Sequence, residues 1–328
     1  PNLENIMGKM KDIGNVLTQM DNPNLKIIMG KMDPAKIGKV LVSMIDTNHE
    51  IKNIMNNMEE GKIEKVLVQM DNADGLNKIV DKEPAKIGKV FVQMEKPNLE
   101  NIMGKMDPAK IGKVLVQIDD LNLIMGKIDN TKIGKLLVKI EDPNLKNIMG
   151  KIDNTKIGEL LLSFLEDPMK VDNLNTIVRN MKHEKIGDML VEIDYVDREL
   201  IVNQINAEKI GEVLVSRIDN NHNIEDIMTE MDPKNIGKML LSLEDEGLNK
   251  IVGRMKPTKI KDALVSMNNI VHANRPADEA KLKKIMNQIN AEKIGEVLAL
   301  GPNVLEDEIN KIVGQMEPAK IRYVLVSM

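Results

Sequence analysis

Hydrophobic residues recur along this chain at helical spacing, in pairs of short stripes separated by a turn. Within residues 99–118, the first stripe follows positions i, i+3, i+4 and i+7 and consists of Leu99, Ile102, Met103 and Met106. The second stripe has the same spacing and consists of Ile111, Val114, Leu115 and Ile118. This period predicts two amphipathic helices, because a strand would alternate with a period of two. Each helix, at roughly eight to eleven residues, is too short to be stable alone.

Asp107 and Pro108 lie between the two stripes and are typical of a helix start. The Asp107 carboxylate can accept hydrogen bonds from the free amides of the first turn, and Pro108 suits the first helical position, where no N–H is needed. Similar pairs recur at Asp33-Pro34, Asp142-Pro143, Asp167-Pro168, Asp232-Pro233, Glu83-Pro84 and Glu317-Pro318. We therefore expect a very short turn within each pair of helices.

Each pair of stripes is one unit of a tandem repeat. The second stripe opens with a box of the form Lys-Ile-Gly-x-Val/Leu/Met-Leu or a close variant. The first Ile of its thirteen copies is Ile13, Ile37, Ile63, Ile87, Ile111, Ile133, Ile157, Ile186, Ile210, Ile236, Ile260, Ile294 and Ile321. Successive copies are most often 24 residues apart. The pattern predicts an all-α solenoid of about thirteen two-helix repeats, forming one domain over residues 1–328 that is either complete or part of a longer array.

Two insertions interrupt the repeat, at residues 165–172 and 268–281, and each is either a partner-binding elaboration or a tolerated loop. The second insertion is predicted to start a longer helix at Pro276. The core face of that helix would carry Leu282, Ile285, Met286 and Ile289. Glycines recur inside the helices, as at Gly104 and Gly112, and we interpret them as points where a neighbouring helix approaches closely; exposed flexibility is the alternative.

Residues 106–118, MDPAKIGKVLVQI, resemble the short-helix repeats of the N-terminal domain of MgtE-type magnesium transporters. They are also similar to repeats of the flagellar rotor switch protein FliG and of MotE-like flagellar proteins. The resemblance implies a right-handed superhelix and a role in protein binding or assembly. Thirteen units is longer than those domains, and the CBS and membrane domains of a transporter are absent, so the resemblance does not imply magnesium transport.

Composition excludes several classes of function. The net charge of −5 and an aromatic content of 1% argue against nucleic-acid binding, which uses basic surfaces and stacking rings. No apolar run is long enough to insert into a membrane. The chain has no cysteine, which excludes disulfides and thiolate sites. We favour a soluble, cytoplasmic protein, although a signal peptide removed before Pro1 would place it in the periplasm or outside the cell.

No catalytic constellation is visible, so we predict a protein that is not an enzyme and has no cofactor and no metal site. The four histidines, His49, His183, His222 and His272, are far apart in sequence and are interpreted as surface residues. Aspartates at helix starts could gather divalent cations, but helix capping explains them without metal. The stretch 71–75, DNADG, lacks the spacing of a calcium loop. The 25 methionines are interpreted as core filler and not as a copper site.

The candidate function is therefore a structural or assembly scaffold that binds protein partners or copies of itself along an extended repeat surface. An ion-sensing or regulatory module, by analogy with the MgtE N-terminal domain, is the alternative. Lysines around the Ile-Gly pair form either a solvated face or a docking strip for an acidic partner: Lys86, Lys89, Lys110, Lys113, Lys132 and Lys135. Apolar residues near the two ends indicate either further repeats or end-to-end stacking of subunits: Leu3, Ile6, Met7, Val324, Leu325 and Met328.

Overall fold

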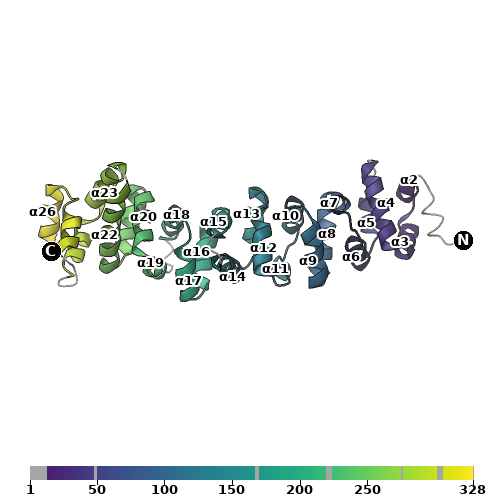
Figure 1. The fold of residues 1–328 in the computed structure, drawn as a ribbon, viewed down its shortest axis with the longest axis horizontal. Coiled ribbons are helices and arrows are strands. Elements are labelled where there is room, and N and C mark those ends of the chain that lie inside the picture. Colours follow the sequence, from purple (N-terminus) through teal and green to yellow (C-terminus); the bar gives the residue numbers. More distant parts are fainter. Residues whose placement is uncertain are drawn as a thin grey trace. The chain divides into compact units, whose positions relative to one another are not determined.

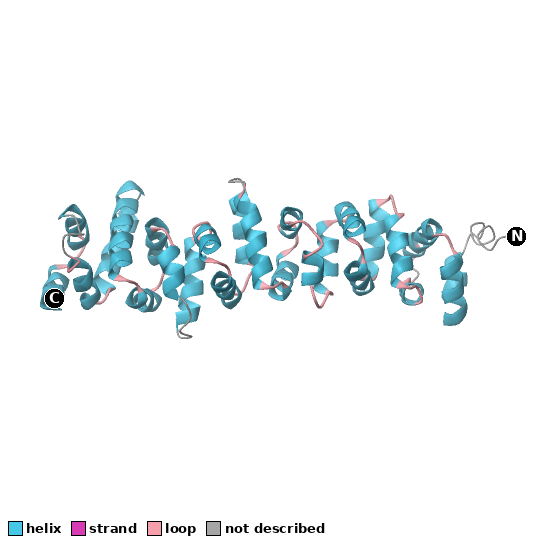
Figure 2. Ribbon diagram, turned by 90° about the horizontal axis from the view of Figure 1, so that it is seen from below, coloured by secondary structure: helices cyan, strands magenta, loops and turns pink. Residues whose placement is uncertain are grey.

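The computed structural model describes residues 13–47, 50–166, 170–218, 224–274, 276–300 and 306–327, without the side chains of 272–278. In this part of the chain 25 helices are joined by short loops, and no strand is present (Figures 1 and 2). The all-α fold class predicted from the hydrophobic stripes is therefore confirmed.

Contacts divide the chain into two compact units, residues 1–156 and 157–328, with the boundary inside α14 (Asn154–Leu165). The single domain expected over residues 1–328 stays a prediction. Unit 1 contains α2 (Ile13–Thr18), α3 (Asn22–Lys31), α4 (Pro34–Asp46), α5 (Lys52–Asn56), α6 (Glu60–Val68), α7 (Ala73–Lys82), α8 (Pro84–Gln93), α9 (Lys96–Lys105), α10 (Pro108–Val116), α11 (Asn122–Met125), α12 (Asn130–Leu137) and α13 (Asp142–Lys151). Unit 2 contains α15 (Val171–Arg179), α16 (His183–Glu192), α17 (Tyr195–Val202), α18 (Ala207–Arg217), α19 (Ile224–Glu230), α20 (Pro233–Ser242), α21 (Asp245–Arg254), α22 (Pro257–Asn274), α23 (Pro276–Gln288), α24 (Ala291–Leu298), α25 (Glu306–Val313) and α26 (Pro318–Ser327).

The Lys-Ile-Gly box and its variants always lie in an even-numbered helix, as Ile37, Ile111 and Ile210 do in α4, α10 and α18. Within each unit the even-numbered helices contact one another in chain order: α4 packs on α6, α6 on α8, and α8 on α10, while α16 packs on α18, α18 on α20, and α20 on α22 (Figure 1). Odd-numbered helices pack over the even-numbered helix three places earlier, as α7 does on α4 and α21 on α18. Contacts between neighbours in sequence are typical of stacked repeats.

The core of both units consists of the predicted stripes. In α9 and α10 and directly after them, every residue of the two stripes of residues 99–118 is at most 6% exposed. The methionines of the stripes are buried, as core filler should be: Met29, Met32, Met103, Met106, Met149 and Met286. A polarizable side chain with three rotatable bonds fills the gaps of a core that has almost no aromatic residues.

Aspartate capping is confirmed for Asp33 and Asp107, whereas the side chain of Asp232 makes no capping hydrogen bond at the start of α20. The Asp107 carboxylate accepts a hydrogen bond from the Ala109 N–H at 3.0 Å. Asp142-Pro143 differs from the prediction, because Glu141 is the cap of α13 and Asp142 belongs to its first turn. The stretch DNADG is the start of α7, where the Asn72 side chain accepts from the Asp74 N–H at 3.0 Å.

The two glycines of a repeat have different roles. A Cβ atom on Gly112 would lie 2.8 Å from Ile140 Cγ2, so α10 and the turn after α12 approach as closely as the sequence interpretation requires. A Cβ atom on Gly104 would meet nothing within 4 Å. The close-approach interpretation is therefore correct for the glycine of the box and wrong for the glycine of the preceding helix, which faces open space.

The described residues of the insertion 268–281 are helical. It extends α22 to Asn274, and α23 then begins at Pro276, as the sequence predicts. The predicted core face of α23 is buried, with Leu282, Ile285, Met286 and Ile289 each at most 3% exposed. Residues 167–169 of the other insertion lie outside the described part of the chain.

Candidate protein-interaction surface

Asparagine side chains connect successive repeats. In each case the side-chain oxygen accepts a hydrogen bond from the backbone N–H of the residue just before an even-numbered helix, about 30 residues later. The pairs are Asn77 with Asp107, Asn122 with Asp153, Asn175 with Asn206, Asn203 with Asp232, and Asn287 with Glu317, at 2.7–3.1 Å. These asparagines satisfy N–H groups that a helix start leaves without a partner. Sequence analysis missed them, although the regular offset was visible.

Lysines at the ends of odd-numbered helices cap earlier even-numbered helices. Lys127 Nζ donates to the carbonyl oxygens of Val92 and Met94 at 2.6 and 2.9 Å. Lys151 Nζ contacts the corresponding carbonyls of the next repeat at the same distances. A positive charge at a helix C-terminus satisfies free carbonyls and interacts favourably with the helix dipole. Much of the polar surface is therefore used within the array.

Four of the six lysines predicted to bind a partner make ion pairs inside unit 1. Lys86 pairs with Glu60 at 2.8 Å, and Lys132 pairs with Glu100 at 2.8 Å. Lys110 and Lys113 share the Asp81 carboxylate, at 2.8 and 2.6 Å. Hydrogen bonds from these two lysines lower the pKa of Asp81. Lys89 and Lys135 are exposed, so the docking strip stays a prediction that rests mainly on them.

The predicted end residues are only partly described. Leu3, Ile6, Met7 and Met328 lie outside the described residues. Val324 is 1% exposed, so it belongs to the core of unit 2, whereas Leu325 is 64% exposed on α26. Tyr323 and Val326 are exposed on the same helix.

Few groups in the described part of the chain could support chemistry. His183 Nε2 lies 3.0 Å from Glu212 Oε2, and the side chain of this histidine is 36% exposed. His49 and His222, and the side chain of His272, lie outside the described residues. Within the described ranges no three histidine or acidic side chains are grouped to hold a metal ion. No helix there is long and apolar enough to cross a membrane.

The repeat formed by residues 195–218 departs from the others in its core. Three positions before the central Ile of the odd-numbered helix, other repeats have a buried leucine or isoleucine: Leu25, Ile51, Leu76, Leu99, Leu121, Leu145, Leu174, Ile224, Leu248 and Leu282. Here the residue is Arg198, whose side chain is only 13% exposed. Its guanidinium donates to the carbonyl oxygens of Leu190 and Ile193 and pairs with Glu230 at 3.0 Å. Burial nevertheless raises the pKa of Glu230.

A second arginine of the same repeat occupies a core position at the end of α18. Seven residues after the first Ile of the box, all the remaining copies between Ile13 and Ile260 have Met, Ile, Leu or Phe. The copy that begins at Ile210 has Arg217 instead, which is 7% exposed. Arg217 Nη1 donates to Asp188 Oδ1 at 2.7 Å and to the Glu184 carbonyl at 3.1 Å. Its Nε is buried without a partner, and its side chain lies against Gly187.

The outward face of the same repeat is apolar. On α17, Tyr195, Val196 and Leu200 are 68%, 47% and 50% exposed. At the position of Leu200 other repeats have polar residues, among them Lys78, Asn101, Asn147 and Lys250. Ile27 and Leu123 are exposed at this position too, but no second large hydrophobic residue is exposed among the described residues of α3 or α11. The repeat 195–218 therefore has charged residues inside and apolar residues outside. Sequence analysis missed this reversal, although both arginines break the repeat pattern.

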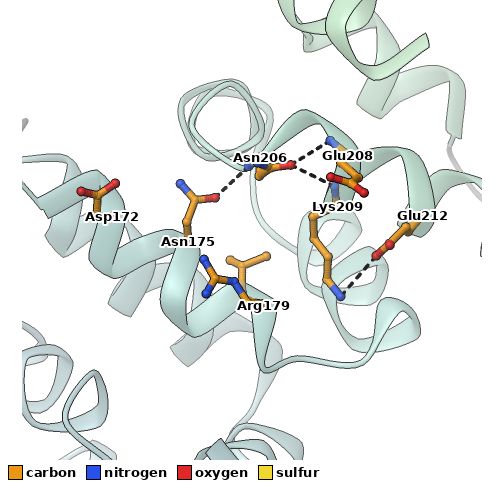
Figure 3. Close-up of a pocket in the computed structure, with 8 residues that line it drawn as sticks. Asp172, Asn175, Arg179, Asn206, Glu208, Lys209 and Glu212 are labelled. Carbon is orange, nitrogen blue, oxygen red and sulfur yellow. Dashed lines mark hydrogen bonds and ion pairs between the residues drawn. The ribbon is translucent and has the colours of Figure 1, made fainter. Parts of the chain in front are cut away.

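Two pockets flank α18 of this repeat. The first, of about 380 Å³, lies between α15 and the start of α18 (Figure 3). In it Asn175 accepts from the Asn206 N–H, while Asn206 caps α18 and Lys209 lies 3.6 Å from Glu212. These contacts connect consecutive repeats or cap α18. The described residues that line this pocket include no nucleophile paired with a base. The second pocket, of about 590 Å³, lies between α18 and α21, and its lining includes Glu208, Glu244 and Glu246.

The sequence matches no protein-family model, and no curated protein is significantly similar to it.

Proposed function

We propose that this chain is a non-enzymatic repeat scaffold that binds protein partners, or copies of itself, along its repeated surface. The observation that carries the proposal is the reversal in the repeat 195–218, where Tyr195, Val196 and Leu200 are exposed on a helix whose equivalents are mostly polar outside. Natural sequences depart from local rules mainly at functional sites. Exposed aromatic and aliphatic residues grouped on one helix are typical of protein-binding surfaces.

The repeat architecture supports the same proposal. Asparagine and lysine side chains connect consecutive repeats through backbone groups, which suits a stiff support for binding surfaces. The resemblance to MgtE-type, FliG and MotE-like repeats agrees with an assembly role, and we propose from it a right-handed superhelix of about thirteen repeats. An ion-sensing module is the competing function, but no observation on the described residues favours it.

Sedimentation velocity over a range of protein concentrations, with EDTA and with millimolar magnesium, tests the proposal. A scaffold that assembles with itself should grow with concentration, and a scaffold for other proteins should stay monomeric; in both cases the sedimentation coefficient should be indifferent to metal. A sedimentation coefficient that magnesium changes and EDTA restores would overturn the proposal in favour of ion sensing.

A further inference from the structure

The α17 surface, defined as Tyr195, Val196, Glu199 and Leu200, is not required by the fold. These residues lie on the exposed side of α17, while Ile201 and Val202 on its other side are buried. The repeats with Asn101 or Asn147 in place of Leu200 have the same packing of their odd-numbered helix, with a buried Ile and Met beside them. Folding therefore does not explain why apolar side chains face outward here.

Arg198 holds this surface in one orientation. Its guanidinium bonds the Ile193 carbonyl before α17 and the Glu230 carboxylate at the end of α19, and α19 packs against α17. The Asp194 carboxylate caps the helix by accepting from the Asp197 N–H at 3.0 Å. A helix fixed at its N-terminal end and to the neighbouring α19 presents its outer side chains already ordered, which lowers the entropy cost of binding.

The charges around the α17 surface are negative. Asp194 and Glu199 on or next to α17, and Asp226 on α19, are exposed. The cation of α17 itself, Arg198, is largely buried in its own bonds. Burial and the neighbouring Asp194 raise the pKa of Asp197. The pKa of Glu230 is raised first by burial and also by the charges of Asp226 and Glu199. Raised carboxyl pKa values are expected where negative charges accumulate. Unit 2 as a whole has 29 acidic against 22 basic residues, whereas residues 1–156 have 22 against 24.

We propose that the α17 surface docks a cationic amphipathic helix from another protein. Val196 and Leu200 would contact the apolar face of that helix, while Asp194, Glu199 and Asp226 would attract the lysine or arginine residues beside it. The Tyr195 ring, which is 68% exposed, suits a cation–π contact with one of those side chains. This inference rests on the proposed scaffold function and specifies its partner.

Fluorescence anisotropy with three labelled peptides tests the inference on the full chain. The first peptide is an amphipathic helix of leucine and lysine, the second has glutamate in place of lysine, and the third has lysine but no leucine. We expect the first to bind most tightly and its binding to weaken as salt is raised. The substitutions Leu200→Asn and Glu199→Gln should each weaken it, the former by about tenfold, as for loss of an apolar contact residue.

Leu123→Asn is the matched control, because Leu123 is 48% exposed at the equivalent position of another repeat and lacks acidic and aromatic neighbours on its own helix. It should leave peptide binding unchanged. Circular dichroism should show that all three variants are folded, since the changed side chains are exposed. Equal binding of the glutamate peptide, or of the lysine peptide without leucine, would overturn the inference. So would binding that Leu200→Asn does not weaken.

The outcomes separate this inference from the scaffold proposal. If the wild-type chain associates with itself and Leu200→Asn abolishes the association, the occupant of the α17 surface is a second copy. In that case the cationic partner is wrong and the scaffold function stands. If magnesium controls sedimentation, the scaffold function fails whatever the peptides do.

Discussion

The contrast between Gly112 and Gly104 allows a test of how closely the repeats pack. Alanine should be favoured over glycine by about 0.5–1 kcal/mol at either helical position, since neither glycine has a backbone conformation that excludes a side chain. At Gly104 the added methyl meets nothing within 4 Å, so this gain should be realised in full. At Gly112 the same methyl would lie 2.8 Å from Ile140 Cγ2.

Ile140 cannot easily move away. It is 4% exposed, and its β-branched side chain has a restricted χ1 angle, so relief requires an unfavourable rotamer or separation of α10 from α12. Overpacking of this kind costs about 1–3 kcal/mol. Because the gain in helix propensity is similar for both substitutions, the difference in stability between Gly104→Ala and Gly112→Ala should be about 1–3 kcal/mol, which isolates the packing term.

Native-state hydrogen exchange is the suitable assay, because repeat arrays open locally and need not unfold in one step. In peptides that cover residues 96–118, exchange should be slower in Gly104→Ala than in the parent. It should be about five- to 150-fold faster in Gly112→Ala than in Gly104→Ala. Equal protection in the two variants would refute the reasoning, since it would mean that the even-numbered helices do not approach closely at this glycine.

Three further predictions concern the polar contacts between repeats. Arg217→Met restores the apolar residue of the other repeats. It removes the contacts with the Glu184 carbonyl and with the half-exposed Asp188, whose carboxylate can be solvated, so the melting temperature should be unchanged or higher; a fall of several degrees would contradict this. Asn203→Ala removes the side chain that bonds the Asp232 N–H and the Glu230 carbonyl, so the free energy of unfolding measured with urea should fall by about 1–3 kcal/mol. The control is Asn101→Ala, on an exposed face, which should have little effect. Hydrogen bonds from Lys110 and Lys113 lower the pKa of Asp81 in the folded chain. The stabilising effect of the ionised Asp81 should therefore be complete above its unfolded pKa of about 3.9 and be lost as the pH falls through its folded pKa. Asp81→Asn should flatten this part of a curve of stability against pH, and an unchanged curve would refute the prediction.

Much of the helical architecture follows from local rules. The stripes of residues 99–118, the cap at Asp107 and the start of α23 at Pro276 depend on residues within two turns of one another, so the sequence alone predicts them. The local rules also have limits. Asp142-Pro143 has the same letters as Asp107-Pro108 but opens the first helix of its repeat, with Glu141 as the cap.

The candidate surface was harder to predict, because it depends on which side of each helix faces a neighbour. Arg198 and Arg217 were visible in the sequence as charged residues, but a charged residue at one helix position is common at surfaces. Only their burial, and their contacts with Glu230 and Asp188 in adjacent helices, show that they belong to the core. The exposure of Leu200 likewise follows from the packing of α17 on α16 and α19.

The sequence by itself determined the helices, their order and most of the apolar residues of the core, because helical periodicity and capping act over a few residues. The tertiary structure decided which glycine is crowded, which lysines are paired and which apolar side chains remain exposed, because each of these depends on side chains about 30 residues away in the next repeat. Spacing within one repeat cannot reveal the distance to a neighbour that lies across the stack.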